Sequence, residues 1–358
     1  MWPDRRLIDL FDIEHPIVLA PMAGAMDVDL AAEVSVAGGL GSLPAGMLNC
    51  EALRDQFANF RRRTDKPVNV NFFCHTPPTL NNAREARWRD LLAPYYRELG
   101  IDPAAPVPSS NRAPFDAAFC ELVEEIKPSV VSFHYGLPAA DLLVRVKAAG
   151  CCVICSATTP AEAVALERAG VDAVIAQGTE AGGHRGTFLT EDVATQIGTF
   201  ALVPQVADAV GVPVIAAGGI ADARGIAAAF ALGAAAVQIG TGYLRCPEAK
   251  ISATYRAALS HAAADSTVMT NVMSGRAARG IVNRVIRDLG PISDVAPAFP
   301  LAAGALAPLR AKAEAAGSGD FSPLWSGQAA ALGRDMPAGE LTKVLATEAQ
   351  ALLRRLAA

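Results

Sequence analysis

The sequence has 358 residues, of which 52% are hydrophobic and 19% are charged, and its formal net charge is −5 at pH 7. This apolar content excludes a disordered or fibrous chain, and the length fits either one large α/β domain with an appendage or two domains. The acidic balance excludes binding to nucleic acid or to an anionic membrane by charge alone. Seven scattered cysteines do not predict a disulfide scaffold.

Two segments resemble targeting or membrane signals, and both have a better explanation. Near the N-terminus Asp9, Asp12 and Glu14 precede the first apolar run, which is not the pattern of a signal peptide. Residues 225–244 carry no charge, but Gly233 divides them into a short helix and a strand. We therefore expect a soluble, cytoplasmic protein without a membrane span.

Short apolar or β-branched runs, taken in chain order, predict eight strands. These runs are nearly continuous in apolar residues, as expected of parallel strands covered by helices. They comprise residues 17–21, 39–45, 68–73, 130–136, 151–157, 172–178, 212–219 and 235–241. Helical stretches such as 160–170 and 222–233 lie between them, each ending in a glycine that suits a helix C-cap. Eight strand–helix repeats predict a (β/α)₈ barrel of the TIM type, with a doubly wound open sheet as the alternative.

Three stretches lie outside this repeat. Residues 74–114 are rich in Pro, Arg and Asn, and they predict a long insertion with a helix near 83–99 that forms a lid over the barrel 1–245. Residues 246–324 show no strand rhythm and predict a smaller, mainly helical cap domain. Residues 325–358 include leucines at helical spacing, so we expect a C-terminal helix that packs back on the barrel.

Glycines at the ends of the last two predicted strands indicate a phosphate site. Gly218 and Gly219 end the seventh strand and Gly240 ends the eighth. Backbone N–H groups at such turns can approach a phosphate closely because no Cβ is in the way, and these strands form the usual phosphate site of a (β/α)₈ barrel. The pattern does not say which phosphate. Neither a G-x-G-x-x-G fingerprint after the first strand nor a P-loop motif is present.

Two of the five histidines follow predicted strands. His184 lies among Gly182, Gly183 and Gly186, and we interpret this segment as a flexible loop that holds a general base over the barrel mouth. The alternative is a surface histidine in a mobile loop. His134 ends the fourth strand, where a catalytic role and a hydrogen-bonded rim position are equally compatible with the sequence. No histidine–carboxylate spacing predicts a metal site.

Several segments, read together and in order, resemble one enzyme family. They are LAPMAG, VNVNFF, VSFHYGLP, IAQGTEAGGHRGTF, VIAAGGIAD, QIGTGYL, SGRAARGIVN and LWSGQAA. This combination resembles the nitronate monooxygenases, formerly called 2-nitropropane dioxygenases. The resemblance covers nearly the whole chain and is weakest over 74–114.

The resemblance implies a cofactor and a set of site residues. Family members bind FMN non-covalently at the barrel mouth, and their catalytic histidine matches His184, with His134 a second polar group in the substrate cavity. Of the two asparagines on the third strand, Asn71 rather than Asn69 matches the flavin contact. The cofactor-binding positions that it implies are Ala20, Pro21, Met22, Ala23, Gly24, Asn71, Gln177, Gly182, Gly183, Gly218, Gly219, Gln238, Ile239, Gly240 and Thr241.

The resemblance also implies a reaction. An alkyl nitronate would give one electron to FMN, O₂ would trap the resulting radicals, and a carbonyl compound and nitrite would form without a metal, in a monomer or homodimer. One alternative is an FMN-dependent NAD(P)H reductase acting on enoyl-acyl-carrier-protein or quinone. Another is a non-redox isomerase or synthase whose phosphate site holds the substrate itself.

Overall fold

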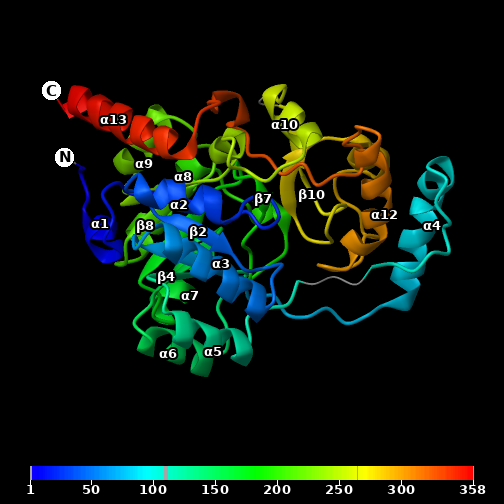
Figure 1. Ribbon diagram of the computed structural model, residues 1–358, viewed down its shortest axis with the longest axis horizontal. Helices are drawn as coiled ribbons and strands as arrows, with labels where there is room; N and C mark the ends of the chain where they lie inside the picture. The colour runs from blue at the N-terminus through cyan, green and yellow to red at the C-terminus, as the bar shows by residue number, and fades with distance from the viewer. Residues whose placement is uncertain (1, 109–111, 264, 358) are drawn as a thin grey trace.

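The computed structural model describes residues 2–108, 112–263 and 265–357 (Figure 1). Eight parallel strands form its central sheet, and all eight fall within the segments predicted from sequence. They are β1 (Ile17–Leu19), β2 (Gly41–Pro44), β3 (Val68–Phe73), β4 (Val130–His134), β5 (Cys152–Ala157), β6 (Ala173–Gln177), β8 (Val214–Ala217) and β9 (Ala236–Ile239).

The sheet curls into a nearly closed barrel. Its strand order is β1-β9-β8-β6-β5-β4-β3-β2, in which β1 pairs in parallel with β9. The remaining gap is bridged beside β2, where Val18 and Leu40 form a parallel bridge. This closure confirms the (β/α)₈ barrel and excludes the open doubly wound sheet.

Helices cover the outside of the barrel. They are α2 (Val28–Val36), α3 (Cys50–Arg63), α5 (Ala117–Ile126), α6 (Ala140–Ala148), α7 (Pro160–Arg168), α8 (Thr199–Ala209), α9 (Ala223–Ala231) and α13 (Ala338–Ala357). The C-terminal α13 contacts both α9 and α2, so it packs back on the barrel as predicted and completes the ring of helices. Its inner face buries Leu341 and Leu345 in the main core.

The amino-terminal end of the barrel is filled with apolar side chains. Val18, Val130 and Ile154 point inward there and pack with Leu7 and Phe11 of α1 (Arg6–Phe11). Because alternate residues of a strand face opposite sides, the next inward positions toward the carboxyl ends are different, and they include several polar side chains. Only the carboxyl end of the barrel is therefore built for a polar ligand.

A second hydrophobic cluster lies beside the barrel, at the right of Figure 1. It joins α4 (Asn82–Glu98), which lies in the 74–114 insertion as predicted, to α11 (Arg284–Leu289) and α12 (Ala302–Ala315). Trp88 of α4 donates a hydrogen bond to the carbonyl of Ala302, at 3.2 Å. The domain boundaries at 245 and 324, and the lid role of 74–114, stay predictions.

The segment after β9 contains strands that the sequence analysis did not identify. Besides α10 (Ala253–Ser260), α11 and α12 it includes β10 (Thr267–Thr270) and β11 (Ala278–Ile281), which pair with each other, and β11 also pairs with β7 (Gly183–His184). These strands have two to four residues, too few to show an apolar alternation. Short 3₁₀ helices occupy Val193–Thr195, Thr241–Arg245 and Ala330–Leu332.

The uncharged segment 225–244 is divided as predicted. Gly233 has a φ of +97° and separates α9 from β9. Within the described part of the chain, no helix is both long and apolar enough to cross a bilayer.

Candidate active site

A cavity of about 270 Å³ opens at the carboxyl ends of the barrel strands. It is lined by every predicted cofactor-binding residue except one. Ile239 is instead packed in the core of β9, and only its backbone serves the site, accepting a hydrogen bond from Ala20 N–H at 2.9 Å. The Ile239 side chain points outward between two positions that face the cavity, Gln238 and Gly240, so a role of Ile239 in cofactor binding stays a prediction that depends on its backbone.

The glycine turns after β8 and β9 have the properties of an anion site. Within residues 2–108, 112–263 and 265–357, the N–H groups of Gly219 and Gly240 have no hydrogen-bond acceptor, although both residues line the cavity. Gly218 has a φ of +109°, and a Cβ there would lie 2.9 Å from the backbone nitrogen of Ala181. Free N–H groups in these glycine turns, the first of which contains the positive φ of Gly218, fit a bound phosphate.

Side-chain amides line the same cavity. Gln238 Oε1 is buried and accepts no hydrogen bond from any described residue, so it requires a donor from a ligand or water. Asn71 donates to Ser132 Oγ at 2.9 Å and lines the cavity. Asn69 lies deeper in the barrel, where it donates to Ser42 Oγ at 2.9 Å. The geometry thus places Asn71, not Asn69, where a ligand can reach it.

The segment that carries His184 is held firmly. Gln177 Nε2 donates to the His184 carbonyl at 2.9 Å, and Gln177 Oε1 accepts from Gly186 N–H at 2.8 Å. Arg185 is fully buried and donates to the Gly178 carbonyl at 2.8 Å. The buried carboxylate of Glu162 accepts from Phe188 N–H at 2.8 Å. The prediction of a flexible loop was therefore wrong, because His184 belongs to β7 and its neighbours are fixed by hydrogen bonds.

His184 lies in an apolar and cationic environment. Its ring is 5.1 Å from that of Trp325 and 5.2 Å from that of Phe299, and its Nε2 is 2.9 Å from Ser274 Oγ. Burial holds the His184 pKa well below 6.5, and the Arg112 guanidinium lowers this pKa further. His184 is therefore neutral at neutral pH and able to accept a proton.

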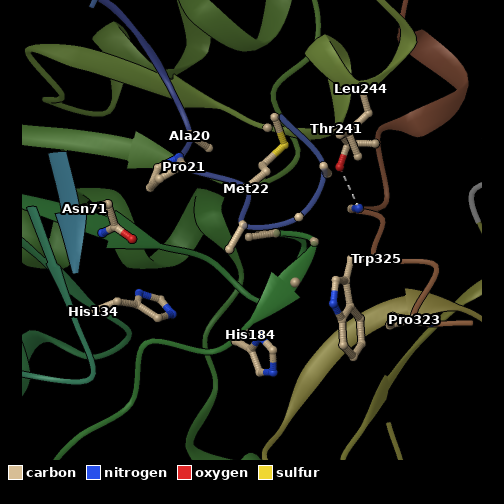
Figure 2. Close-up of a pocket in the computed structure, with 18 of the residues that line it drawn as sticks. Ala20, Pro21, Met22, Asn71, His134, His184, Thr241, Leu244, Pro323 and Trp325 are labelled. Atoms are coloured by element: carbon tan, nitrogen blue, oxygen red, sulfur yellow. Dashed lines mark hydrogen bonds between the residues drawn. The ribbon is translucent and has the colours of Figure 1, made fainter. Parts of the chain in front are cut away.

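His134 lies on the opposite side of the cavity from Trp325 (Figure 2). Its Nδ1 is 2.6 Å from Ser156 Oγ. Burial, and then the nearby Arg276 guanidinium, lower the His134 pKa to about 3. The hydrogen-bonded position that we considered for His134 is thus present in the structure, and its ring also lines the cavity.

Residues 325–327, a strap that follows β11, connect the two ends of the site. Gly327 N–H donates to Thr241 Oγ1 at 2.9 Å, which Figure 2 marks with a dashed line, and Trp325 next to it packs on His184. A Cβ on Gly182 would lie 2.5 Å from the Gly327 nitrogen, so the strap and the β6 loop touch through glycines. The position of His184 therefore depends on residues more than a hundred positions later.

Sequence reasoning missed several residues that line the cavity or contact His184. Arg112 lines the cavity from the 74–114 insertion, where the resemblance was weakest. Trp325 and Ser274 lie within the segments LWSGQAA and SGRAARGIVN. The resemblance included both segments but assigned no role to these two residues. Among the described residues, no group of three or more His, Cys, Asp or Glu side chains is arranged to hold a metal ion.

The low pKa of His184 predicts an unusual pH profile. A histidine with a depressed pKa stays neutral until the pH falls below its folded-state value, so kcat/KM for a substrate that must lose a proton should stay level from pH 8 to below 6.5. Arg276→Gln removes one of the cations that lower this pKa and should move the acidic limb to higher pH. Arg97→Gln, on the exposed face of α4, is the control. If the wild-type kcat/KM falls to half its plateau at or above pH 6.5, the assignment of a lowered pKa to His184 is contradicted.

These features define a class of protein. A (β/α)₈ barrel with free N–H groups after its last two strands and a neutral histidine across the cavity has the form of an enzyme that holds a phosphorylated ligand. Residues 4–348 match the nitronate monooxygenase family. The chain belongs to that family.

Individual relatives agree with this assignment. The chain is 44% identical to the nitronate monooxygenase of Paraburkholderia phytofirmans over 356 residues, covering 98% of this chain and 97% of the relative. It is 44% identical to the nitronate monooxygenase of Pseudomonas aeruginosa over 345 residues, covering 96% and 98%.

Two solved structures are also similar. Nitroalkane oxidase from Streptomyces ansochromogenes has a TM-score of 0.89 and 38% identity, with 99% of this chain and 100% of that chain covered. FabK from Thermotoga maritima has a TM-score of 0.74 and 32% identity, with 98% of each chain covered.

Proposed function

We propose that this protein binds FMN and oxidises alkyl nitronates with O₂ to carbonyl compounds and nitrite. The observation that carries the proposal is one continuous cavity with two chemically different parts. One part offers free backbone N–H groups at Gly219 and Gly240, and the other presents Arg112 and His184, whose ring packs on Trp325.

The residues of the first part fit FMN. The N–H groups of Gly219 and Gly240 would hold its phosphate, and the unpaired Gln238 Oε1 would accept a hydrogen bond from an O–H or N–H group elsewhere in FMN. The segment Ala20–Gly24 would lie along its ring system, together with Asn71 and Gln177. When bound, FMN supplies the electron-accepting ring for the reaction.

The residues of the second part fit a nitronate anion and the neutral nitroalkane from which it forms. A nitronate carries a negative charge, and the Arg112 guanidinium at the cavity wall would attract it. A neutral nitroalkane must first lose its α-proton, which neutral His184 would accept. The rings of Phe73 and Trp325 supply apolar walls that suit an alkyl chain. A cytoplasmic location and a monomeric or homodimeric state stay predictions from the sequence.

An FMN-dependent reductase is the second candidate, supported by the similarity to FabK. The higher identity to proteins named nitronate monooxygenase, over nearly the whole chain, favours nitronate oxidation. A non-redox isomerase or synthase would require a protein that does not retain FMN.

The test is a measurement of nitrite release and oxygen uptake with a panel of alkyl nitronates, on protein whose released flavin is identified after denaturation. We expect FMN in the supernatant, together with nitrite and oxygen consumption. FAD in the supernatant, or oxygen uptake without nitrite, would refute the proposal.

A further inference from the structure

The catalytic histidine has a hydrogen-bond partner that the proposed function does not yet use. Ser274 follows β10 and is 2% exposed. Its Oγ lies 2.9 Å from His184 Nε2 and donates to the backbone carbonyl of Arg276 at 3.3 Å. Ser274 therefore lies between the imidazole and a fixed carbonyl acceptor.

Counting hydrogens gives this contact a direction. A serine hydroxyl has one hydrogen, and the Arg276 carbonyl, which can only accept, lies 3.3 Å from the Ser274 oxygen. When the hydroxyl donates to that carbonyl, the Ser274 oxygen accepts from His184, whose Nε2 then carries a hydrogen. A neutral imidazole has one N–H, which leaves the lone pair on Nδ1.

The other ring nitrogen is the one open to a ligand. Nδ1 of His184 has no hydrogen-bond partner among the described residues, and it is not one of their fully buried polar atoms. His184 lines the cavity, and Nδ1 is its ring nitrogen without a partner among the described residues. Nδ1, the ring nitrogen that carries no hydrogen in this tautomer, is thus also the one that a ligand can reach.

We propose that Ser274 is a positioning residue that holds neutral His184 in the Nε2–H tautomer, so that Nδ1 is the atom that removes the α-proton of a nitroalkane. In this step the C–H bond breaks and its electron pair becomes the C=N bond of the nitronate. One N–O π pair moves onto oxygen, and the proton binds Nδ1. The Nε2–H bond to Ser274 persists, and the proton on Nδ1 later passes to water. The inference rests on the proposed function.

The first test is spectroscopic and does not depend on turnover. ¹⁵N NMR of protein labelled at histidine distinguishes a protonated from an unprotonated ring nitrogen, and His184→Asn identifies the resonances among the five histidines. Near neutral pH we expect His184 to show an unprotonated Nδ1 and a protonated Nε2. The opposite tautomer in the wild-type protein would overturn the proposal.

The second test compares two substrates. Ser274→Ala should lower kcat/KM for a nitroalkane by about tenfold, the size expected for loss of one hydrogen bond, while kcat/KM for the preformed nitronate changes far less. Ser274→Thr keeps the hydroxyl and should restore nitroalkane activity. The matched control is Ser266→Ala, whose hydroxyl only caps the Ala263 carbonyl at 2.7 Å.

The outcomes separate this inference from the proposed function. Equal losses on both substrates in Ser274→Ala would mean that Ser274 only maintains the cavity, and would overturn the tautomer role. Absence of nitrite with any nitronate would contradict the proposed function, whereas the NMR result would still decide which nitrogen of His184 is protonated. If Ser274→Ala does not fold, Ser274→Thr and the wild-type spectrum decide the matter.

Discussion

Replacing His184 with asparagine should lower kcat/KM for a neutral nitroalkane by about 10²–10⁴-fold, the usual contribution of a general base. Turnover of the corresponding nitronate should fall far less, because the nitronate is already an anion and needs no proton abstraction. The reason is structural: His184 is kept neutral by burial and by Arg112, and it lines the cavity. The measurement is kcat/KM for both substrates, wild type against variant, with bound flavin quantified.

His261→Asn is the matched control, because His261 is exposed and its ring bonds only to the Ala257 carbonyl of its own helix. Equal losses on both substrates would show that His184 positions substrate and is not a base. Loss on neither would exclude His184 from the reaction. If the wild type does not act on nitroalkanes, a fall in nitronate turnover is the only evidence that His184 contributes.

Replacing Gly218 with alanine should weaken FMN binding by about tenfold or more, the effect of roughly 1–3 kcal/mol of backbone strain. A residue with a Cβ rarely adopts the φ of +109° found there, and the new Cβ would lie 2.9 Å from Ala181 N and 3.0 Å from Thr199 Oγ1. Relief of this contact must move the turn that carries the free N–H of Gly219. The dissociation constant is measured by titrating FMN into the apoprotein.

Gly170→Ala separates strain from a specific effect on the site. Gly170 has a comparable φ of +92°, but a Cβ there would meet nothing within 4 Å, and it lies after α7 outside the cavity. This variant should lose some stability and keep its affinity for FMN. Equal FMN affinity in Gly218→Ala and wild type would mean that the phosphate lies elsewhere.

The fold could be predicted where the sequence carries long, regular signals. Each barrel strand is an apolar run bounded by turn residues, and eight such runs are enough to specify a closed barrel. The short strand β7 was missed because its pairing with β11 depends on contacts between residues 183–184 and 278–279. Nothing local in either segment indicates that partner.

The site could be predicted in part for the same physical reason. Positions at strand ends, such as Asn71 and Gly218, follow from the strand register, and they do line the cavity. Ile239 is the predicted cofactor-binding residue that does not line the cavity, because successive side chains of a strand face opposite sides. Arg112 and Ser274 reach the cavity or His184 from segments outside the barrel repeat, so no spacing in the sequence predicts their contacts.

We infer that this cavity oxidises nitronates and is not primarily an NAD(P)H-dependent reductase site. The most direct test mixes the FMN-loaded protein anaerobically with an alkyl nitronate or with NADH or NADPH and follows the absorbance of the bound flavin. We predict a rapid spectral change with the nitronate and, once air is admitted, release of nitrite. Little or no change should follow addition of either nicotinamide nucleotide. Rapid bleaching by NADH or NADPH, with no response to nitronates, would contradict the account.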